Sequence, residues 1–396
     1  MSSNFTAIDL FSGAGGFSLA AHSVGFNLLA AIEFDVNAAN TCHQNLVQKL
    51  GASTQVFAQD INDVDIDGLM KYQGLKQREL DLLLGGPPCQ GFSSHRIKDA
   101  GKDDPRNALL LRYFDFVERL KPKVFLLENV PGLLWARHAD YLAKFLKLAE
   151  EHDYQVITGA PVIINARDYG VPQNRKRAFI LALRKDISAG ELIWPPQATH
   201  TNAGENKWNT ASTVFEKPAD EVIDGFKERL IKKFDFTQDA AHKCIDNLVW
   251  GKPLEANDPC NVHMQHSEKM TSLFKGTPLL GSRDESGREL ACHKDYAGHK
   301  DVYGRIFPHL PSNTMTTGCN NPSKGRFVHP WLDHGISLRH AARLQTFPDD
   351  YLFGGGIMSM AKQIGNAVPV ELGKALISTI TEALEAQSCI KKAARF

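Results

Sequence analysis

The sequence predicts an α/β protein built on a doubly wound, mostly parallel sheet of seven strands. Three observations favour this fold. Short runs rich in apolar and β-branched residues alternate with segments of helical periodicity through the first half of the chain. A glycine-rich loop directly follows the first run, at the place where an open parallel sheet binds ligands. After residue 188 the alternation stops, which indicates a second, smaller and irregular domain.

Seven runs are expected to be strands, with helical segments between them. The expected strands are residues 6–11, 27–33, 55–59, 80–85, 124–128, 155–164 and 177–183. Residues 105–120 are expected to be a helix, because Pro105 suits a first helical turn and apolar residues then recur at helical spacing. Further helices are expected at residues 17–24, 338–345 and 369–386.

The irregular segment determines the expected domain boundaries. From residue 188 to about residue 321 the chain contains Pro195-Pro196, isolated aromatic residues and many histidines, without a repeated alternation of strand and helix. We therefore expect a larger domain over residues 1–187 and 333–396 and a smaller one over residues 188–332. A chain of 396 residues is long enough for two such domains.

Composition excludes several classes of protein. The chain is 43% hydrophobic and 23% charged, and it has no apolar stretch long enough to span a bilayer, so we expect no membrane partner. The N-terminal residues lack a basic region followed by an apolar signal core, which predicts a cytoplasmic protein. Seven scattered cysteines, an odd number, argue against a disulfide framework and leave each available as a thiol.

A nucleic-acid surface on this chain would have to be local, because the formal net charge is zero. Residues 303–332 contain no Asp or Glu, whereas Arg305, Lys324 and Arg326 supply positive charge. This stretch is either a surface that faces a polyanion or a loop that is poor in acids by chance, and composition leaves both interpretations open.

The loop Asp9-Leu10-Phe11-Ser12-Gly13-Ala14-Gly15-Gly16 lies between the first expected strand and a helix. Its glycines allow a tight turn and a close approach of the backbone to a ligand. Glu33 ends the second expected strand, where an acid binds ribose hydroxyls in Rossmann-type sites, so the two features together favour a cofactor that contains adenosine. Asp60 follows the third strand, where it either accepts from an adenine amino group or caps a helix.

One cysteine lies in a stiff turn, Gly85-Gly86-Pro87-Pro88-Cys89-Gln90-Gly91-Phe92-Ser93. A lone cysteine is more often a small buried apolar residue than a nucleophile. Here two prolines hold the backbone before Cys89, and the turn directly follows an expected strand. We therefore expect Cys89 to act as a nucleophile at the edge of the sheet.

Two further motifs carry charge at strand ends. Glu128 closes an apolar strand that neighbours the strand before Cys89, and a carboxylate there is costly unless it is paired or used. Arg175 and Arg177 point to the same face if their segment is extended.

Residues 363–369 are expected to open the last helix, with Asn366 as a turn or cap residue and Pro369 in the first helical position.

Taken together and in this order, these segments resemble the bacterial cytosine-5 DNA methyltransferase family. The motifs that carry the resemblance are Phe11-Ser12-Gly13-Ala14-Gly15-Gly16, Pro87-Pro88-Cys89-Gln90, Glu128-Asn129-Val130, Gln173-Asn174-Arg175-Lys176-Arg177, Arg343-Leu344-Gln345-Thr346-Phe347-Pro348 and Gly365-Asn366-Ala367-Val368-Pro369. The resemblance covers about residues 5–184 and 303–380. It implies a Rossmann-like, S-adenosylmethionine-dependent methyltransferase domain, and a target recognition domain over residues 188–332.

The resemblance implies S-adenosyl-L-methionine as the cofactor and double-stranded DNA as the partner. It assigns to the cofactor Phe11, Gly13, Gly15, Gly16, Glu33, Phe34, Asp60, Ile61, Gly86, Pro88, Leu109, Asn366 and Val368. Together with the distribution of charge, it assigns to DNA Gln90, Ser93, Arg96, Arg305, Thr314, Lys324 and Arg326. We expect a monomer that protects host DNA from a cognate restriction endonuclease.

The reaction expected from this resemblance methylates carbon 5 of a cytosine that has been flipped out of the duplex. The thiolate of Cys89 attacks carbon 6, because the ring must be activated before it accepts a methyl group. Glu128 protonates or hydrogen-bonds ring N3 if burial raises its pKa, and Arg177 holds ring O2 and orients Glu128. Arg175 helps to position the loop or a phosphate.

Three alternatives remain at this point. An RNA cytosine methyltransferase would carry the same catalytic residues, although the long segment 188–321 favours a reader of duplex DNA. A catalytically silent DNA-binding relative would not need intact Cys89 and Glu128. A zinc module could use Cys260, His263, His266, Cys292 and His293, but these residues lack two spaced cysteine pairs, so we expect no metal.

Overall fold

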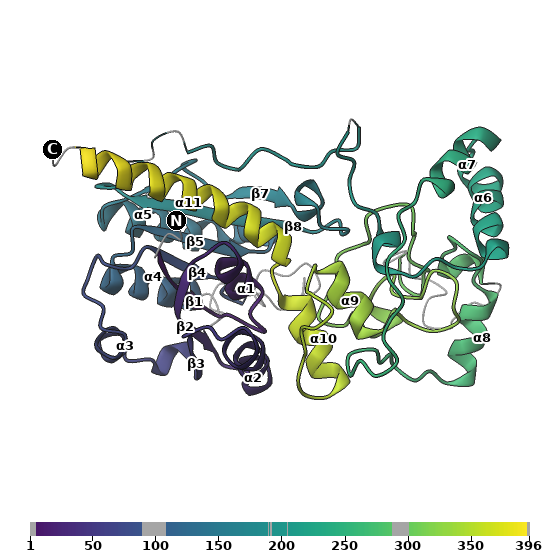
Figure 1. Ribbon diagram of the computed structural model, residues 1–396, viewed down its shortest axis with the longest axis horizontal. Helices are drawn as coiled ribbons and strands as arrows, with labels where there is room; N and C mark the ends of the chain where they lie inside the picture. The colour runs from purple at the N-terminus through teal and green to yellow at the C-terminus, as the bar shows by residue number, and fades with distance from the viewer. Residues whose placement is uncertain are drawn as a thin grey trace. The chain divides into compact units, whose positions relative to one another are not determined.

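The computed structural model describes residues 5–88, 108–188, 190, 192–203, 205–286 and 301–393, and these form two compact units. The sheet unit comprises Met1–Asn165, Lys176–Ala198 and Val368–Phe396, and the second unit comprises Ala166–Arg175 and Thr199–Ala367. Figure 1 shows the elements of both units, coloured along the chain. The second unit includes residues 333–367, so it is larger than the expected small domain over residues 188–332. The predicted division into a methyltransferase domain and a target recognition domain stays a prediction.

In the described part of the sheet unit, eight strands form one mixed sheet in the order β3-β2-β1-β4-β5-β8-β6, with β7 also paired to β8. The strands are β1 (Thr6–Leu10), β2 (Asn27–Glu33), β3 (Gln55–Ala58), β4 (Leu82–Gly85), β5 (Val124–Asn129), β6 (Tyr154–Val156), β7 (Val162–Asn165) and β8 (Lys176–Arg184). Strands β1 to β5 pair in parallel, whereas β8 is antiparallel to β5, β6 and β7. The predicted α/β sheet is confirmed.

The predicted number of strands is corrected from seven to eight. The segment 155–164, expected to be one strand, contains β6 and β7 with a turn between them. Gly159 adopts a positive φ of 68° in this turn, and the Thr158 hydroxyl donates to the Ala160 carbonyl oxygen. Both short strands pair antiparallel with β8, one after the other, and the turn between them interrupts the pairing.

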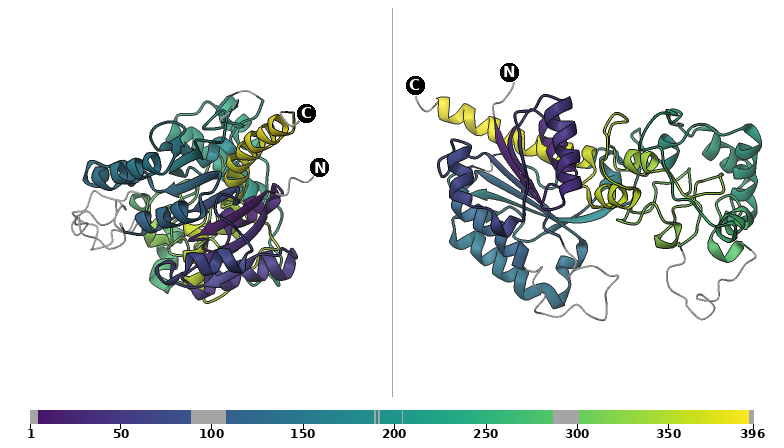
Figure 2. Two further views of the ribbon diagram at one scale, coloured as in Figure 1. Left: turned by 90° about the vertical axis from the view of Figure 1, so that its left-hand side faces the viewer. Right: turned by 90° about the horizontal axis from the view of Figure 1, so that it is seen from below.

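Helices cover both faces of this sheet. They are α1 (Gly16–Ser23), α2 (Val36–Cys42), α3 (Ile66–Tyr72), α4 (Ala108–Leu120), α5 (Ala139–Glu151) and α11 (Val370–Ala393). Helices α1 and α11 pack together on one face, and α4 and α5 lie on the other (Figure 2). Gly373 permits the close contact of α11 with α1, since a Cβ at Gly373 would lie 2.7 Å from the Ala20 methyl.

In its described part, the second unit consists of short helices among irregular loops, with isolated β-bridges in place of strands. Its helices are α6 (Asp220–Phe234), α7 (Gln238–Asp246), α8 (Glu268–Gly276), α9 (Leu338–Leu344) and α10 (Ile357–Asn366). The sequence analysis missed α6, α7 and α8. The spacing of Ile223, Phe226 and Leu230 is helical, and these side chains form a core with Trp331 at its edge. Short helices among irregular loops concealed this pattern.

Single turns of 3₁₀-helix or π-helix connect these elements. They are η1 (His43–Lys49), η2 (Ile61–Asp63), η4 (Pro131–Leu134), η5 (Ala136–His138), η6 (Ala166–Tyr169), η7 (Ala211–Val214), η8 (Arg283–Glu285) and η10 (Pro322–Lys324). No helix among the described residues combines the length and the apolar character that crossing a membrane requires.

The start of the last helix differs from the prediction. Asn366 is the last residue of α10, and α11 begins at Val370. The Ala367 N–H still donates to the Gln363 and Ile364 carbonyl oxygens, while Ala367 itself has extended dihedral angles. The chain therefore leaves one helix before Pro369 and enters the next after it, so Asn366 does not cap α11.

Candidate active site

The carboxyl ends of the parallel strands β1 to β5 meet at one edge of the sheet. Strand β1 lies between β2 and β4, with β3 beyond β2 and β5 beyond β4. The strand order therefore reverses between β1 and β4, which is where open α/β sheets bind their ligands. Most of the residues that the sequence analysis assigned to a cofactor lie in the loops at this edge.

The glycine-rich loop after β1 is held by a carboxylate from β2. Glu33 accepts the Gly13 N–H through Oε2 at 2.8 Å and the Asp35 N–H through Oε1 at 2.7 Å. Three residues of the loop have positive φ, namely Phe11 at 58°, Gly13 at 55° and Gly15 at 89°. The loop needs glycine for two of these turns, and Glu33 fixes its middle.

The surroundings of this loop fit an adenosine-containing cofactor. A Cβ built at Gly13 would have no atom within 4 Å, so there is open space in front of the loop. The Phe34 side chain is 71% exposed, and Phe11 is half-buried. Glu33 ends β2 beside this loop, where an acid binds ribose hydroxyls in Rossmann-type sites. Gly15 and Gly16 are buried at the start of α1.

Asp60 and Ile61 have local roles in addition to those expected. Asp60 Oδ1 accepts the Asn62 N–H at 2.9 Å and so caps η2, as the capping interpretation predicted. The Ile61 side chain is buried, and its carbonyl oxygen accepts from Arg112 Nε at 3.0 Å. These contacts place the Asp60 carboxylate after β3, at the same edge of the sheet as Glu33.

Two glycines at the end of β4, Gly85 in the strand and Gly86 after it, allow close contacts with α4 and β5. A Cβ at Gly85 would lie 2.6 Å from the Tyr113 ring, and one at Gly86 would lie 3.2 Å from Glu128 Oε2. Leu109 is half-buried against the core, and Pro88 is exposed. Val368 is buried in the sheet unit, whereas Asn366 is exposed at the end of α10 in the second unit.

Asp9, the first residue of the glycine-rich motif, had no predicted role, and it is buried in β1. Ser18 of α1 donates its hydroxyl to Asp9 Oδ2 at 2.6 Å, which joins the two sides of the loop. Burial raises the pKa of Asp9 to about 7, and the negative charge of Glu33 adds to the rise. An acid within the apolar run Ala7-Ile8-Asp9-Leu10-Phe11 was the available signal.

Glu128 and Arg177 form an ion pair at the ends of β5 and β8. Arg177 Nε lies 2.9 Å from Glu128 Oε1, and both side chains are largely buried. The antiparallel pairing of β5 with β8 brings them together, with Glu128 opposite Phe179. Asn129 Nδ2 donates to the Pro87 carbonyl oxygen at 3.4 Å. The sheet thus gathers Glu128, Arg177 and the Pro87-Pro88 turn at one place.

Four predicted residues of the site lie outside the described residues: Cys89, Gln90, Ser93 and Arg96. The described turn ends at Pro88, one residue before the predicted nucleophile.

Arg175 and Arg177 would share one face only in an extended segment, and the structure does not meet this condition. Strand β8 begins at Lys176, so the strand alternation does not extend to Arg175. Arg175 belongs to the second unit and is 1% exposed. Its guanidinium donates to the carbonyl oxygens of Met315, Gly365 and Ala367. These contacts are structural, and they correct the assignment of Arg175 as a catalytic or phosphate-binding residue.

The predicted DNA contacts of Arg305 and Arg326 are also corrected. Both side chains are buried. All five N–H groups of Arg305 donate within the second unit, to the carbonyl oxygens of Thr277, His329, Leu332 and Phe274 and to Asp333. Those of Arg326 donate to Gly281, Arg305, Ser282 and Asp301. An arginine has five donors, so neither side chain has one left for a phosphate.

The other two predicted DNA residues in the described part of the second unit are more accessible. Lys324 is exposed at the end of η10. Thr314 is half-buried, and its hydroxyl donates to the Asn174 carbonyl oxygen at 2.8 Å.

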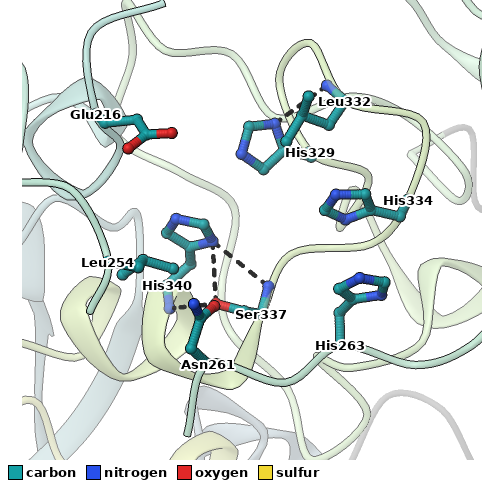
Figure 3. A pocket seen from close by; sticks show the side chains of 9 residues that line it. All are labelled: Glu216, Leu254, Asn261, His263, His329, Leu332, His334, Ser337 and His340. Atoms are coloured by element: carbon teal, nitrogen blue, oxygen red, sulfur yellow. Dashed lines mark hydrogen bonds between the residues drawn. The ribbon is translucent and has the colours of Figure 1, made fainter. Parts of the chain in front are cut away.

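His263, one of the residues considered as zinc ligands, lines a cavity of about 370 Å³ in the second unit (Figure 3). The rings of His263 and His334 stack with centroids 4.0 Å apart, and the cavity is also lined by His329 and His340. His266 packs edge-on against Phe274, and Cys260 is buried. Cys292 and His293 lie outside the described residues, and within the described residues no three such ligands are arranged to hold a metal ion.

Comparisons with known proteins agree with this arrangement. A family model described as C-5 cytosine-specific DNA methylase matches residues 5–382. The chain is 29% identical over 392 residues to the type II methyltransferase M.DdeI of Desulfomicrobium norvegicum, with 94% of this chain and 88% of the relative covered. It is 30% identical to the type II methyltransferase M.AgeI of Thalassovita gelatinovora, with 95% and 99% covered.

The fold also has a counterpart among solved structures. A prophage-encoded protein (E. coli), named as a DNA modification methyltransferase, is similar with a TM-score of 0.65 and 23% sequence identity, and the similarity covers 96% of this chain and 100% of that chain.

Proposed function

The chain belongs to the C-5 cytosine-specific DNA methylase family, and on that premise we propose that it takes its methyl group from S-adenosyl-L-methionine bound at the carboxyl ends of β1 to β4. The enzyme is a DNA (cytosine-5)-methyltransferase, and it acts on a cytosine flipped out of DNA through a covalent cysteine adduct. When bound, the donor supplies an electrophilic methyl group on its sulfonium sulfur.

The observation that carries the donor proposal is the position of Glu33. Its carboxylate accepts the N–H of Gly13 in the glycine-rich loop and the N–H of Asp35 after β2, and it lies where an acid binds ribose hydroxyls in Rossmann-type sites. The half-buried Phe11 and the exposed Phe34 are the proposed contacts of the adenine ring. Gly86, Pro88, Leu109, Asn366 and Val368 remain proposed donor contacts on the strength of the family motifs.

Glu128 and Arg177 are proposed to act on the cytosine ring together. Addition of the Cys89 thiolate to carbon 6 places negative charge on the ring, and a proton or hydrogen bond from Glu128 to N3 disperses that charge. Arg177 keeps Glu128 in place through the 2.9 Å ion pair and offers its remaining N–H groups to ring O2. Once carbon 5 carries the methyl group, removal of its proton re-forms the double bond between carbons 5 and 6 and expels the Cys89 sulfur as a thiolate.

The biological setting is proposed from the relatives. Several of them are type II methyltransferases, so we propose that the enzyme modifies a short duplex sequence and protects it from a cognate restriction endonuclease. We also propose that it works as a monomer in the cytoplasm.

The polymer and the donor are tested in one experiment. The enzyme is incubated with radiolabelled S-adenosyl-L-methionine and either duplex DNA or tRNA, and 5-methylcytosine is located by sequencing. We expect label in DNA at one repeated sequence context. Label in RNA alone would contradict the proposed substrate, and absence of transfer from this donor to either polymer would contradict the proposed donor.

Glu33→Gln is expected to weaken binding of the non-reactive analogue S-adenosyl-L-homocysteine about 10- to 100-fold. The reason is that hydrogen bonds to a charged acceptor contribute about 1.5–3 kcal/mol. Isothermal titration calorimetry measures the change, with Glu79→Gln as the control, because Glu79 is an exposed acid in the same unit that accepts the Lys76 N–H. An affinity within twofold of the unmutated enzyme would exclude Glu33 from the donor site.

Lys324→Ala is expected to weaken duplex binding about two- to fivefold and to reduce the salt dependence of binding by about one counterion, because Lys324 is exposed and able to reach a phosphate. Arg305→Lys is expected instead to lower the melting temperature, since it breaks contacts of a buried guanidinium. Fluorescence anisotropy at several salt concentrations and thermal melting separate the two effects. If Arg305→Lys lowered the salt slope with unchanged melting, the structural role of Arg305 would be refuted.

A further inference from the structure

The cavity in Figure 3 contains two buried polar side chains that the proposed function does not use. Its volume of about 370 Å³ lies within the range of about 300–1,000 Å³ that is typical of small-molecule sites. All of its lining residues belong to the second unit. His329 and His340 are only 3% and 7% exposed and lie at its buried end, whereas Glu216 and Leu332 are exposed at its open end.

The hydrogen bonds of each buried ring place its proton on Nε2. His329 Nδ1 accepts the N–H groups of Trp331 at 3.4 Å and Leu332 at 3.2 Å. His340 Nδ1 accepts the Ser337 N–H at 3.4 Å. A ring nitrogen that accepts a backbone N–H carries no proton itself, so Nε2 is the donor of each ring. Burial also lowers the pKa of both rings, that of His340 to about 3, so both are neutral near pH 7.

The two Nε2–H donors face the cavity. The centroids of the two rings are 5.4 Å apart, and Figure 3 shows both Nε2 atoms on the side of the cavity where the Glu216 carboxylate lies. In the described part of the chain, neither Nε2 has a hydrogen-bond partner in the protein. A buried N–H group costs free energy unless an acceptor meets it, so these two donors are suited to acceptor atoms of a bound molecule.

Aromatic rings surround this polar group. Phe215 packs against both buried histidines, with its ring centroid 5.1 Å from that of His329 and 4.5 Å from that of His340. His263 and His334, which also line the cavity, stack on each other with an interplanar angle of 8°. Flat rings favour a planar occupant, because a planar molecule packs against them by its face or its edge.

Guanine is the nucleic-acid base whose groups match this arrangement best. Its N7 and O6 are adjacent acceptors on one edge, and they suit the two Nε2–H donors. Its N1–H and N2 amino group are adjacent donors on the next edge, and they suit the two oxygens of the Glu216 carboxylate. Adenine has an amino group in place of O6, and cytosine offers the carboxylate one amino group rather than two adjacent N–H donors.

We propose that this cavity is a guanine-binding site, in which His329 and His340 donate to N7 and O6 and Glu216 accepts from N1–H and N2. The base comes either from a free nucleoside or nucleotide or from a DNA strand in which it is displaced from its neighbours, and the recognising groups are the same for both sources. The site lies entirely within the second unit, so it is independent of the proposed methyl donor and of the flipped cytosine.

Equilibrium dialysis of the whole protein with radiolabelled 2′-deoxyguanosine tests the site. Deoxyguanosine is expected to bind at least about tenfold more tightly than deoxyadenosine or deoxycytidine. The 7-deaza analogue, which lacks the N7 acceptor, is expected to bind about two- to tenfold more weakly than deoxyguanosine, as the loss of one hydrogen bond predicts. Equal binding of all four nucleosides, or no binding of deoxyguanosine at millimolar concentration, would overturn the proposal.

Glu216→Gln is expected to weaken deoxyguanosine binding about tenfold, because it removes a charged acceptor of two N–H groups. Glu221→Gln is the matched control, since Glu221 is an exposed acid of the same unit that does not line the cavity, and it is expected to leave binding unchanged. His340→Phe keeps the ring contact with Phe215 and removes one donor, so it is expected to weaken binding about two- to tenfold.

The variants decide the proposal even if His340→Phe does not fold, because Glu216 is exposed and its replacement by glutamine leaves the core intact. Equal affinities in Glu216→Gln and Glu221→Gln would overturn the assignment of the site.

Competition distinguishes the two sources of the base. Two duplexes are compared that differ only in a single unpaired base, guanine in one and adenine in the other. Stronger displacement of labelled deoxyguanosine by the guanine duplex would identify the occupant as a base of DNA, whereas equal displacement would identify it as a free nucleoside or nucleotide. Neither measurement depends on methyl transfer, so a failure of the proposed donor would leave the result for this site unaffected.

Discussion

Cys89→Ala is expected to lower the rate of methyl transfer by about 10⁴-fold or more, while the affinity for S-adenosyl-L-homocysteine stays within about twofold. Removal of a covalent nucleophile typically has an effect of this size, because without it the cytosine ring is not activated. Transfer is measured with radiolabelled donor. A duplex with 5-fluorocytosine at the target gives a second measurement, since fluorine cannot leave as a cation and the adduct through the Cys89 sulfur therefore persists in the unmutated enzyme.

The described thiols provide the controls for this experiment. Burial raises the pKa of Cys42 and Cys260, and it raises that of Cys319 to about 12, so these thiols stay protonated near neutral pH. Cys244 is half-buried in α7 of the second unit, and Cys244→Ala is expected to keep full activity and adduct formation. Turnover in Cys89→Ala above 1% of normal would assign the attack to another group.

Much of the sheet unit was predictable because its signals are local. The strands β1, β2, β3, β5 and β8 agree with the predicted ranges within about one residue, since each is a short apolar run followed by a turn. The turn at Gly159 within the run 155–164 was not recognised, and it produced an additional strand. The helices α6, α7 and α8 were missed because their apolar faces are short and are buried by residues far along the chain, namely Trp331 for α6 and α7 and Val328 for α8.

The candidate site was predictable where a residue's role follows from its place at a strand end. Glu33 and Glu128 are examples, because the carboxyl ends of parallel strands meet at one edge. Arg175, Arg305 and Arg326 were interpreted wrongly, since a sequence shows a positive charge but not the carbonyl groups that surround it. Their guanidinium groups are buried among backbone carbonyl oxygens of the second unit. Sequence spacing cannot distinguish such a residue from one that faces DNA.

A fall in pH from 7.5 to 5.0 is expected to destabilise the second unit by about 4 kcal/mol. His329 and His340 are buried beside the cavity in Figure 3, and burial lowers the pKa of both, that of His340 to about 3. The positive charge of Arg305 disfavours protonation of His329, and that of Arg343 disfavours protonation of His340. The acids near these rings are Glu216, which lines the cavity, and Asp333, which acts on His334. Both rings therefore stay neutral in the folded protein over this range.

The direction of this change in stability follows from the linkage between folding and proton binding. Below pH 6.5 the unfolded chain binds protons on these histidines and the folded chain does not, so stability falls as the pH drops, by about 2 kcal/mol for each ring at pH 5. Asp9 acts in the opposite direction in the sheet unit: its pKa is raised to about 7, so folding there takes up a proton and gains stability as the pH falls from 7 towards 4. Acid is therefore expected to unfold the second unit first.

Urea titrations at pH 7.5 and 5.0 measure the effect, with the fluorescence of Trp331 as a local signal because its ring lies 4.5 Å from that of His329. His340→Phe removes one titrating ring next to Phe215 and is expected to remove about half of the acid-induced loss. His43→Gln, at an exposed histidine of the sheet unit, is the control and is expected to leave the loss unchanged. Equal urea midpoints at the two pH values in the unmutated enzyme would show that these histidines do not resist protonation in the folded state.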